Sequence, residues 1–291
     1  MNADRASRTA MMVAYMRAVA DAGASHVRDF HDPTARVFLN AKWSRRLAKL
    51  EQQVRSGRES MMLAASRVSA DLMALRTATI DAAVRAAVAR GTRQVVILGA
   101  GLDGRAWRMS ELAGVRVFEV DHPATQAVKR SHLDRLPAAI ANVTFVPVDF
   151  ERDSLDAALA SAGHDVSRPT CWIWEGVVMY LSRDAMRSTL AGVASRSANG
   201  STLIVNYHTE PRRGLAALLL RLLGEPHRSN WSPDDMARDL GAAGFHVVED
   251  SGVVEWATRF ATGPVRTEVG RIMRIVVAER AGDHDSPPGN S

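Results

Sequence analysis

The sequence contains very little cysteine and no long apolar run. Cys171 is the one cysteine in 291 residues, which excludes an internal disulfide and any metal site built from several cysteines. No segment supplies the roughly eighteen apolar residues that cross a bilayer, since the strongest candidate, residues 214–224, is too short and contains Arg221. The N-terminus lacks the unbroken apolar stretch of a secretory signal. We therefore expect a cytoplasmic protein with no membrane partner and no metal centre.

Lysine is also scarce, so the positive charge is almost entirely arginine. The formal net charge is +5, and the only lysines are Lys42, Lys49 and Lys129. Basic residues are scattered among acidic ones and no basic run is longer than a pair, whereas nucleic-acid-binding proteins gather such residues in patches. We expect no nucleic-acid partner. A mildly positive field still favours an acidic small-molecule substrate.

The first ninety residues show helical patterns and no strand pattern. A first amphipathic helix is indicated by apolar residues at spacings of three and four, namely Met12, Tyr15, Met16 and Val19. Asp32 and Pro33 interrupt the chain, helical sequence resumes from about residue 34 to 75, and a last helix ends at Gly91. We expect residues 1–90 to form a helical accessory layer. Its first helix, about residues 6–20, is expected to fold over the active-site crevice as a lid.

After residue 91, short β-branched runs alternate with stretches that can form helices, as in a parallel sheet with crossover helices. The five runs expected to be parallel strands are QVVIL (94–98), VRVFEVD (115–121), VTFVPVD (143–149), TCWIWEG (170–176) and STLIVNY (201–207). Two further runs, 244–252 and 271–280, have a loop and no convincing helix between them. We expect them to pair as antiparallel strands at one edge of the sheet.

Five parallel strands with an antiparallel edge pair make the seven-stranded, Rossmann-like α/β sheet of class I methyltransferases. The expected organisation is therefore a helical lid over residues 1–90 and a catalytic core over residues 91–280. Residues 281–291 are polar and contain two prolines, so they are predicted to be a disordered tail.

The first predicted strand ends in a glycine loop that suits two classes of ligand. Gly99, Gly101 and Gly104 match the pattern G-x-G-x-x-G of dinucleotide-binding proteins, so a nicotinamide-dependent oxidoreductase is one interpretation. None of the three tyrosines, however, is followed four residues later by the lysine of Tyr-x-x-x-Lys dehydrogenases. A Rossmann domain starting at the terminus would also leave the helical residues 1–90 unexplained. A glycine turn after a first strand equally accommodates S-adenosylmethionine.

Acidic residues end three successive predicted strands. Asp121 lies about twenty residues after the loop, where a carboxylate accepts both hydroxyls of a ribose. Asp149, beside Phe150, is placed to accept from an adenine amino group while the phenyl ring lies against the base. Glu175 is flanked by apolar runs, where a charge is costly unless it is paired, and we expect it to face the ammonium of a methionine portion. One such acid alone could be a helix cap, but three together indicate a ligand crevice.

Four segments in this order, VVILGAGLDGRAWRM, FEVDHP, VPVDF and WIWEGVVMYL, resemble the leucine carboxyl methyltransferase-like family of S-adenosylmethionine-dependent O-methyltransferases. The N-terminal SRTAMMVAYMRA and DPTARVFL are similar to its bacterial branch. The family includes the enzyme that methylates the C-terminal leucine of protein phosphatases, and bacterial members that methylate carboxyl or hydroxyl groups of polyketides and other natural products. The resemblance implies S-adenosylmethionine as the donor and a small-molecule acceptor.

The resemblance also implies which residues surround the donor. These are Arg76, Gly99, Ala100, Gly101, Asp121, Asp149, Phe150 and Glu175. Arg76 stands where the family places an arginine that pairs with the donor carboxylate, a role that suits its forked guanidinium. Asp121 would hold the ribose, Asp149 with Phe150 the adenine, and Glu175 would lie near the methionine end.

Two features depart from the family or lie outside the donor set. The N-terminal helix lacks the lysine that binds the donor in the eukaryotic branch, which disfavours a phosphatase tail as substrate. Arg17 is the cation that this segment offers instead. Asp103 and Arg105 are expected to be structural, capping the helix after the loop and pairing with neighbours.

Methyl transfer is an in-line displacement at a sulfonium methyl, so the protein mainly aligns the reactants and excludes water. A carboxylate acceptor is already ionised at neutral pH, whereas a phenol benefits from a base. His208, just beyond the fifth predicted strand, is the best-placed imidazole, although a plain loop histidine fits as well. Tyr180 and Tyr207 are candidates for the acceptor pocket. The sequence leaves open the acceptor, the oligomeric state and whether the donor is bound without turnover.

Overall fold

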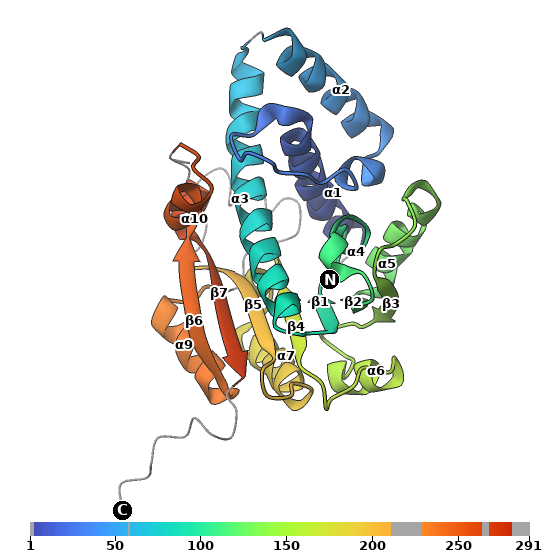
Figure 1. Ribbon diagram of the computed structural model, residues 1–291, viewed down its shortest axis with the longest axis vertical. Coiled ribbons are helices and arrows are strands. Elements are labelled where there is room, and N and C mark those ends of the chain that lie inside the picture. The colour runs from blue at the N-terminus through green and yellow to red at the C-terminus, as the bar shows by residue number, and fades with distance from the viewer. Residues whose placement is uncertain (1–2, 58, 211–228, 264–267, 281–291) are drawn as a thin grey trace, which may run out of the picture.

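The computed structural model describes residues 3–57, 59–210, 229–263 and 268–280. One seven-stranded sheet runs through the molecule in the order β3-β2-β1-β4-β5-β7-β6 (Figure 1). Its strands are β1 (Gln94–Leu98), β2 (Arg116–Asp121), β3 (Asn142–Pro147), β4 (Thr170–Trp174), β5 (Thr202–His208), β6 (Phe245–Gly252) and β7 (Met273–Arg280). Strands β1 to β5 are parallel, and β7 pairs antiparallel with both β5 and β6. The predicted class I methyltransferase sheet is confirmed.

Three N-terminal helices precede the sheet, namely α1 (Ala3–Val19), α2 (Ala41–Ser56) and α3 (Met61–Ala89). Helices α1 and α2 lie above the carboxyl ends of the strands, and α3 runs from this layer down along one face of the sheet (Figure 1). The side chains of Asn40 and Ser60 cap α2 and α3 by accepting from the amides of Trp43 and Leu63. The structure joins two predicted helices into one, because residues 61–89 are rich in alanine, leucine and methionine and contain neither glycine nor proline.

The remaining helices follow the strands in the chain. They are α4 (Arg105–Arg108), α5 (Pro123–Arg130), α6 (Leu155–Ser161), α7 (Arg183–Ser195), α9 (Pro233–Ala242), α10 (Val253–Arg259) and α11 (Glu268–Ile272). Helices α6, α7 and α9 cover the face of the sheet opposite α3, whereas α10 packs beside α3. The expectation that no helix separates the last two strands is wrong, because α10 and α11 lie between β6 and β7. Glu255 caps α10 by accepting from the Gly252 amide, and Trp256 anchors it in the core. Seven residues are too few to show a helical periodicity in sequence.

Buried apolar side chains cover both faces of the sheet. On one face Val95, Ile97 and Ile173 pack with α3, so that this apolar cluster continues across residue 90 into the helical layer. On the other face Val96 and Trp172 pack with helices α6, α7 and α9. Successive side chains of a strand point to opposite faces of the sheet, so the position of a residue along its strand determines the face on which its side chain lies.

Two sequence expectations, the apolar run 214–224 and the tail 281–291, lie outside the described residues. Within the described part of the chain, no helix is both long and apolar enough to span a membrane. The same residues contain no cluster of three or more side chains suited to hold a metal ion.

Candidate functional site

The loop after β1 needs its first two glycines. Gly99 and Gly101 have φ angles of +67° and +49°, in the left-handed region that favours glycine. The amides of Gly99 and Ala100 donate to the carbonyl of Val120 at 2.8 and 3.1 Å, which fixes the loop on β2. A Cβ on Gly99 would lie 2.3 Å from Cγ2 of Val177, so the loop after β4 packs directly on this glycine. The backbone here is therefore close to the centre of the sheet's carboxyl edge.

The third glycine of the dinucleotide pattern serves a different purpose. A Cβ on Gly104 would lie 1.8 Å from Oγ1 of Thr34, so this glycine makes room for the N-terminal layer. The helix that follows, α4, has four residues, and the amide of Arg105 donates to Oδ1 of Asp103 at 2.7 Å. A pyrophosphate needs free amides at a helix N-terminus, whereas a carboxylate already occupies this one. The expected capping role of Asp103 is confirmed.

Asp121 ends β2 beside the loop and is buried. Its Oδ2 accepts from the amide of Gly101 at 2.5 Å, and its Oδ1 accepts from the amide of His122 at 2.6 Å. Burial raises the pKa of the Asp121 carboxyl, and these two amides oppose that rise. Each carboxylate oxygen has two acceptor positions, so both oxygens can still accept a hydroxyl proton from a diol.

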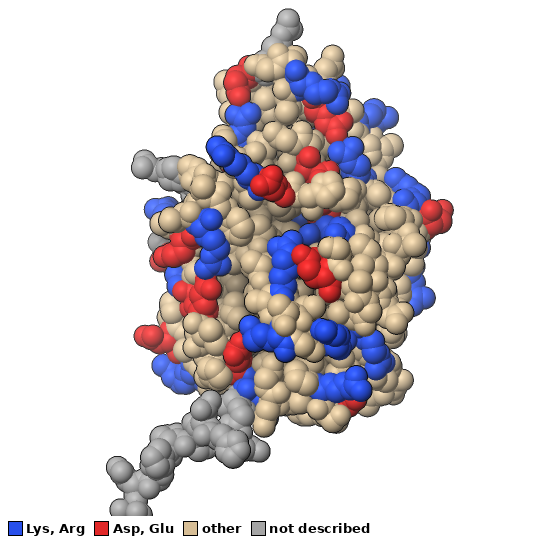
Figure 2. All heavy atoms as spheres, viewed as in Figure 1, with Lys and Arg blue, Asp and Glu red and all other residues tan. Residues whose placement is uncertain are grey.

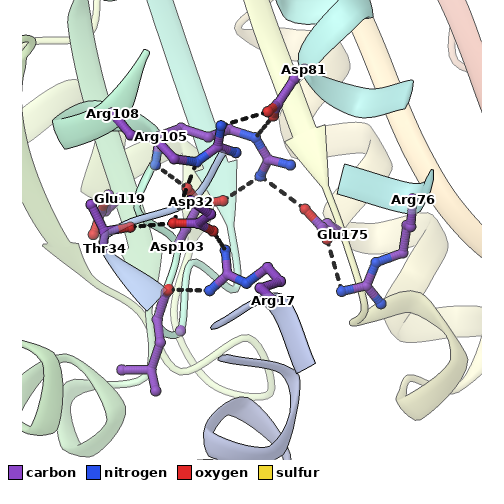
Figure 3. A network of polar contacts seen from close by, with 12 residues as sticks. Arg17, Asp32, Thr34, Arg76, Asp81, Asp103, Arg105, Arg108, Glu119 and Glu175 are labelled. Carbon is purple, nitrogen blue, oxygen red and sulfur yellow. Dashed lines mark hydrogen bonds and ion pairs between the residues drawn. The ribbon is translucent and has the colours of Figure 1, made fainter. Parts of the chain in front are cut away.

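Glu175 follows β4 between two arginines (Figure 3). Its Oε1 lies 2.8 Å from Nη2 of Arg76 on α3, and its Oε2 lies 2.8 Å from Nη1 of Arg105. Burial alone would raise the pKa of the Glu175 carboxyl, but the positive charges of Arg105 and Arg76 outweigh it, so that the pKa is lowered. The sequence predicted Arg76 and Glu175 as separate donor residues, and the structure brings them together.

Two buried guanidinium nitrogens beside Glu175 have no hydrogen-bond partner among the described residues. They are Nε of Arg76 and Nη2 of Arg105. Because an unpaired buried donor is costly, such groups indicate a site for an acceptor that binds there. An α-amino acid carries its ammonium and carboxylate on one carbon, so its receptor needs opposite charges side by side. Glu175 with Arg76 supplies that arrangement.

The arginines at Glu175 belong to a larger buried ionic network (Figure 3). Asp81 of α3 pairs with Arg105 at 2.7 Å and with Arg108 at 2.6 Å. Arg17 of α1 pairs with Asp32 at 3.1 Å and donates to the carbonyl of Leu102 at 2.6 Å. The first helix is thus fastened to the glycine loop itself.

The network contains equal numbers of cations and anions. Most of its pairings were not predicted from the sequence. Its cations are Arg17, Arg76, Arg105, Arg108 and Lys129, and its anions are Asp32, Asp81, Asp103, Glu119 and Glu175. Lys129 lies within 2.7 Å of both carboxylate oxygens of Glu119. One signal was present in the sequence, since Glu119 is a charge flanked by Phe118 and Val120 inside a predicted strand and therefore requires a partner.

Asp149 and Phe150 lie in the loop after β3, next to Asp121. The amide of Val148 donates to the Asp121 carbonyl at 2.9 Å, which holds the start of this loop against β2. Oδ1 of Asp149 accepts from the amide of Glu151 at 3.1 Å, so the residue also caps a turn. Its side chain is 27% exposed, and Phe150 is half-buried. The adenine contacts of both residues stay a prediction.

The three acceptor-pocket candidates fall into two groups. His208 ends β5 and is buried, on the same sheet face as Glu175. Tyr180 is half-buried in the turn after β4. Tyr207 packs on the opposite face, where its hydroxyl donates to Oδ2 of Asp250 at 2.6 Å. The structure therefore separates Tyr207 from the other candidates.

Comparison with known proteins identifies the relatives of the chain. The profile of the leucine carboxyl methyltransferase family matches residues 10–194. A protein of Mycobacterium marinum is 34% identical over 86% of this chain and 80% of its own length, and one of Frankia alni is 47% identical over 44% and 45%. A third, of Streptomyces coelicolor, is 45% identical over 44% and 46%. All three names describe S-adenosyl-L-methionine-dependent methyltransferases.

The extent of these matches differs between relatives. The chain spans about half the length of the Frankia and Streptomyces proteins that it matches. Among solved structures, one described as a methyltransferase of Thermobifida fusca superposes with a TM-score of 0.54 at 19% identity, covering 72% of this chain and 82% of that one. At this identity the likeness shows a shared fold.

Proposed function

Because the chain belongs to the leucine carboxyl methyltransferase family, we propose that it transfers the methyl group of S-adenosylmethionine to a small metabolite. The proposed acceptor group is a carboxylate, giving a methyl ester, or a phenolic hydroxyl, as in a polyketide-type natural product. The observation that carries the proposal is the pairing of Arg76 with Glu175 at 2.8 Å beside the glycine loop.

The described side chains fit the methionine portion of this donor. The sulfonium of S-adenosylmethionine supplies an activated methyl group when it is bound. Arg76 Nε and Arg105 Nη2 are buried donors without a described partner, and they suit the donor carboxylate. Glu175 lies between these arginines and suits the donor ammonium.

The nucleoside portion fits the next two strand ends. We assign the ribose hydroxyls to Asp121, whose two oxygens each keep an acceptor position. We assign the adenine amino group to Asp149 and the face of the ring to Phe150. The left-handed turn at Gly99 and Gly101, with Ala100 between them, lets the backbone approach the donor closely.

The acceptor would enter between the sheet edge and the N-terminal helices. Helix α1 covers the loop, since Cβ of Ala10 lies 3.7 Å from a Cβ placed on Gly101. The protein's part in the displacement is to align the acceptor oxygen with the methyl group and to exclude water. A carboxylate acceptor needs no base. For a phenol we assign proton acceptance to His208, and we assign Tyr180 to the wall of the acceptor pocket. Tyr207 is left out because Asp250 accepts from its hydroxyl.

A labelled-methyl assay tests the proposal. The full chain is incubated with methyl-labelled donor and matched panels of carboxylic acids and phenols, with an Asp121→Asn variant as the donor-site control. We expect label transfer to at least one panel, and release of the label by mild base if the product is a methyl ester. Donor binding without transfer to either panel would contradict the proposed acceptor classes. No observation favours the nicotinamide alternative. The amide of Arg105 at the start of α4, which a pyrophosphate would need, already donates to Asp103.

A further inference from the structure

The net positive charge of the chain is concentrated in one hairpin of helices. Residues 41–68, which span α2 and the start of α3, contain seven lysines and arginines and two glutamates, a formal charge of +5. That equals the formal charge of the whole chain, so the other residues together are neutral. The sequence appeared to scatter its basic residues because they never stand in runs longer than two.

The cations of α2 are exposed and unpaired. The outer face of this helix carries Lys42, Arg45, Arg46, Lys49 and Arg55. None of them forms an ion pair with a residue that the structure describes. Exposed arginines elsewhere do, for example Arg85 with Glu111 at 2.7 Å and Arg183 with Asp235 at 3.2 Å. The one acid of α2, Glu51, is engaged by Arg36 at 3.0 Å.

Four of these cations form one continuous surface. Their spacing of three, four and seven residues places Lys42, Arg45, Arg46 and Lys49 on a single side of α2. They line an open hollow of about 370 Å³. Figure 2 shows several basic side chains over the upper end of the molecule, where this hairpin lies, with a few acidic side chains among them.

Large apolar side chains protrude at the tip of the same hairpin. Met61 is 91% exposed and Met62 is 51% exposed, at the first turn of α3. The tip forms one end of the molecule's long axis (Figure 1). Flexible apolar side chains beside a basic helix face are the two features that peripheral membrane proteins combine, since the cations bind anionic headgroups and the apolar residues enter the interface.

We propose that the α2–α3 hairpin docks on an anionic lipid bilayer. A phosphodiester backbone or an acidic protein surface would match the cations as well, but neither accounts for two methionines held in solvent at the tip. Docking in this orientation leaves the sheet, with Asp121 and Glu175, on the side away from the lipid. The absence of a spanning helix does not bear on a surface contact of this kind.

Vesicle co-sedimentation of the full chain tests the proposal. Vesicles of phosphatidylcholine alone are compared with vesicles that contain phosphatidylglycerol, at low and at high salt. The test variant is Lys42→Gln/Arg45→Gln/Arg46→Gln/Lys49→Gln. The matched control, Arg85→Gln/Arg168→Gln/Arg183→Gln/Arg259→Gln, removes as many exposed cations from elsewhere. A second variant, Met61→Ser/Met62→Ser, tests the apolar part.

We expect sedimentation with the anionic vesicles only, and its loss at high salt. At about fivefold per cation, loss of four cations should weaken binding of the test variant by about 600-fold, while the control variant binds as the unaltered chain does. The serine variant should also bind the anionic vesicles more weakly at low salt. Equal binding to neutral vesicles, undiminished binding of the test variant, or preference for nucleic acid or an acidic protein in competition with vesicles would each overturn the proposal. Circular dichroism of every variant verifies that it is folded.

Discussion

The guanidinium of Arg76, in the middle of α3, lies 2.8 Å from the carboxylate of Glu175 at the end of β4. The N-terminal layer therefore contributes directly to the site at the sheet edge. Glu175 is also paired with Arg105, so one carboxylate joins the glycine loop, the sheet and the long helix. In the proposed site, donor binding and the docking of the helical layer therefore depend on the same contacts.

Replacing Arg76 should weaken donor binding without abolishing the fold. An Arg76→Gln variant removes the proposed carboxylate partner and should bind S-adenosylhomocysteine about tenfold to a hundredfold more weakly, as expected for a charged hydrogen bond. Titration calorimetry measures the effect. The matched control is Arg67→Gln, since Arg67 also lies on α3 and forms an ion pair, with Glu59. Unchanged affinity in Arg76→Gln would remove this residue from the proposed site.

Replacing Asp121 should act on the nucleoside portion. In Asp121→Asn, one of the two carboxylate oxygens becomes an NH₂ group, which donates and does not accept. One of the amides of Gly101 and His122 then loses its acceptor, and one ribose hydroxyl loses its acceptor as well. Affinity for both adenosine and S-adenosylhomocysteine should fall at least about tenfold. Asp165→Asn, at an exposed carboxylate that accepts from Ser167, should have no effect. A loss of affinity for S-adenosylhomocysteine but not for adenosine would contradict the ribose assignment.

The contact between Gly99 and Val177 should be visible in a double-mutant cycle. Gly99→Ala places a methyl group 2.3 Å from Val177 and in an unfavourable φ region, so we expect a loss of about 2 kcal/mol or more in the free energy of unfolding. Val177→Ala removes the clashing Cγ2 atom and should restore part of this loss in the double variant. Urea unfolding measures all four proteins. Strictly additive effects would show that the two residues do not interact.

The buried pair of Lys129 and Glu119 should be costly to break from one side. Lys129→Met leaves a carboxylate buried without its cation and should destabilise the fold by about 3–5 kcal/mol. Burial already raises the pKa of Glu119 to about 7 even with Lys129 present. The Lys129→Met/Glu119→Gln variant removes the lone charge and should be more stable than Lys129→Met alone. If urea unfolding gave both variants the same free energy of unfolding, the unpaired charge of Glu119 would not be the cause of the destabilisation.

His164 should make the fold sensitive to acid. Burial, followed by the charges of Arg196 and Arg116, lowers the pKa of His164 from 6.5 to about 4. A histidine with a lowered folded-state pKa takes up its proton more readily when unfolded, so its contribution to stability is complete above pH 6.5 and declines as the pH falls toward 4. His164→Gln should therefore flatten the pH dependence of unfolding in this window. If the free energy of unfolding of His164→Gln varied with pH as it does in the unaltered chain, titration of His164 would not be the cause of the acid sensitivity.

The strands and the strand-end acids could be read from the sequence, because both depend on local patterns. Short β-branched runs bounded by turn residues placed β1 at its observed residues and β2 within one residue. Asp121 and Glu175 were recognised because each follows such a run, and parallel strands end at a common edge.

The ionic network could not be predicted, because its partners are far apart in the chain. Arg17 and the carbonyl of Leu102 are separated by 85 positions, and no local pattern links α1 to the glycine loop. The third glycine was ambiguous for the same reason, since its neighbour Thr34 comes from the N-terminal layer. The basic face of α2 also emerged only on folding, which gathers residues that the sequence spaces three and four apart.

The central claim is that the glycine loop, Asp121 and the Arg76–Glu175 pair together bind S-adenosylmethionine. Titration calorimetry of the full chain with S-adenosylhomocysteine, and separately with NAD⁺ and NADP⁺, tests it most directly. The account predicts saturable binding of S-adenosylhomocysteine at one site per chain and no heat from either nicotinamide nucleotide. Binding of a nicotinamide nucleotide in its place, or no binding of S-adenosylhomocysteine to the folded chain, would contradict it.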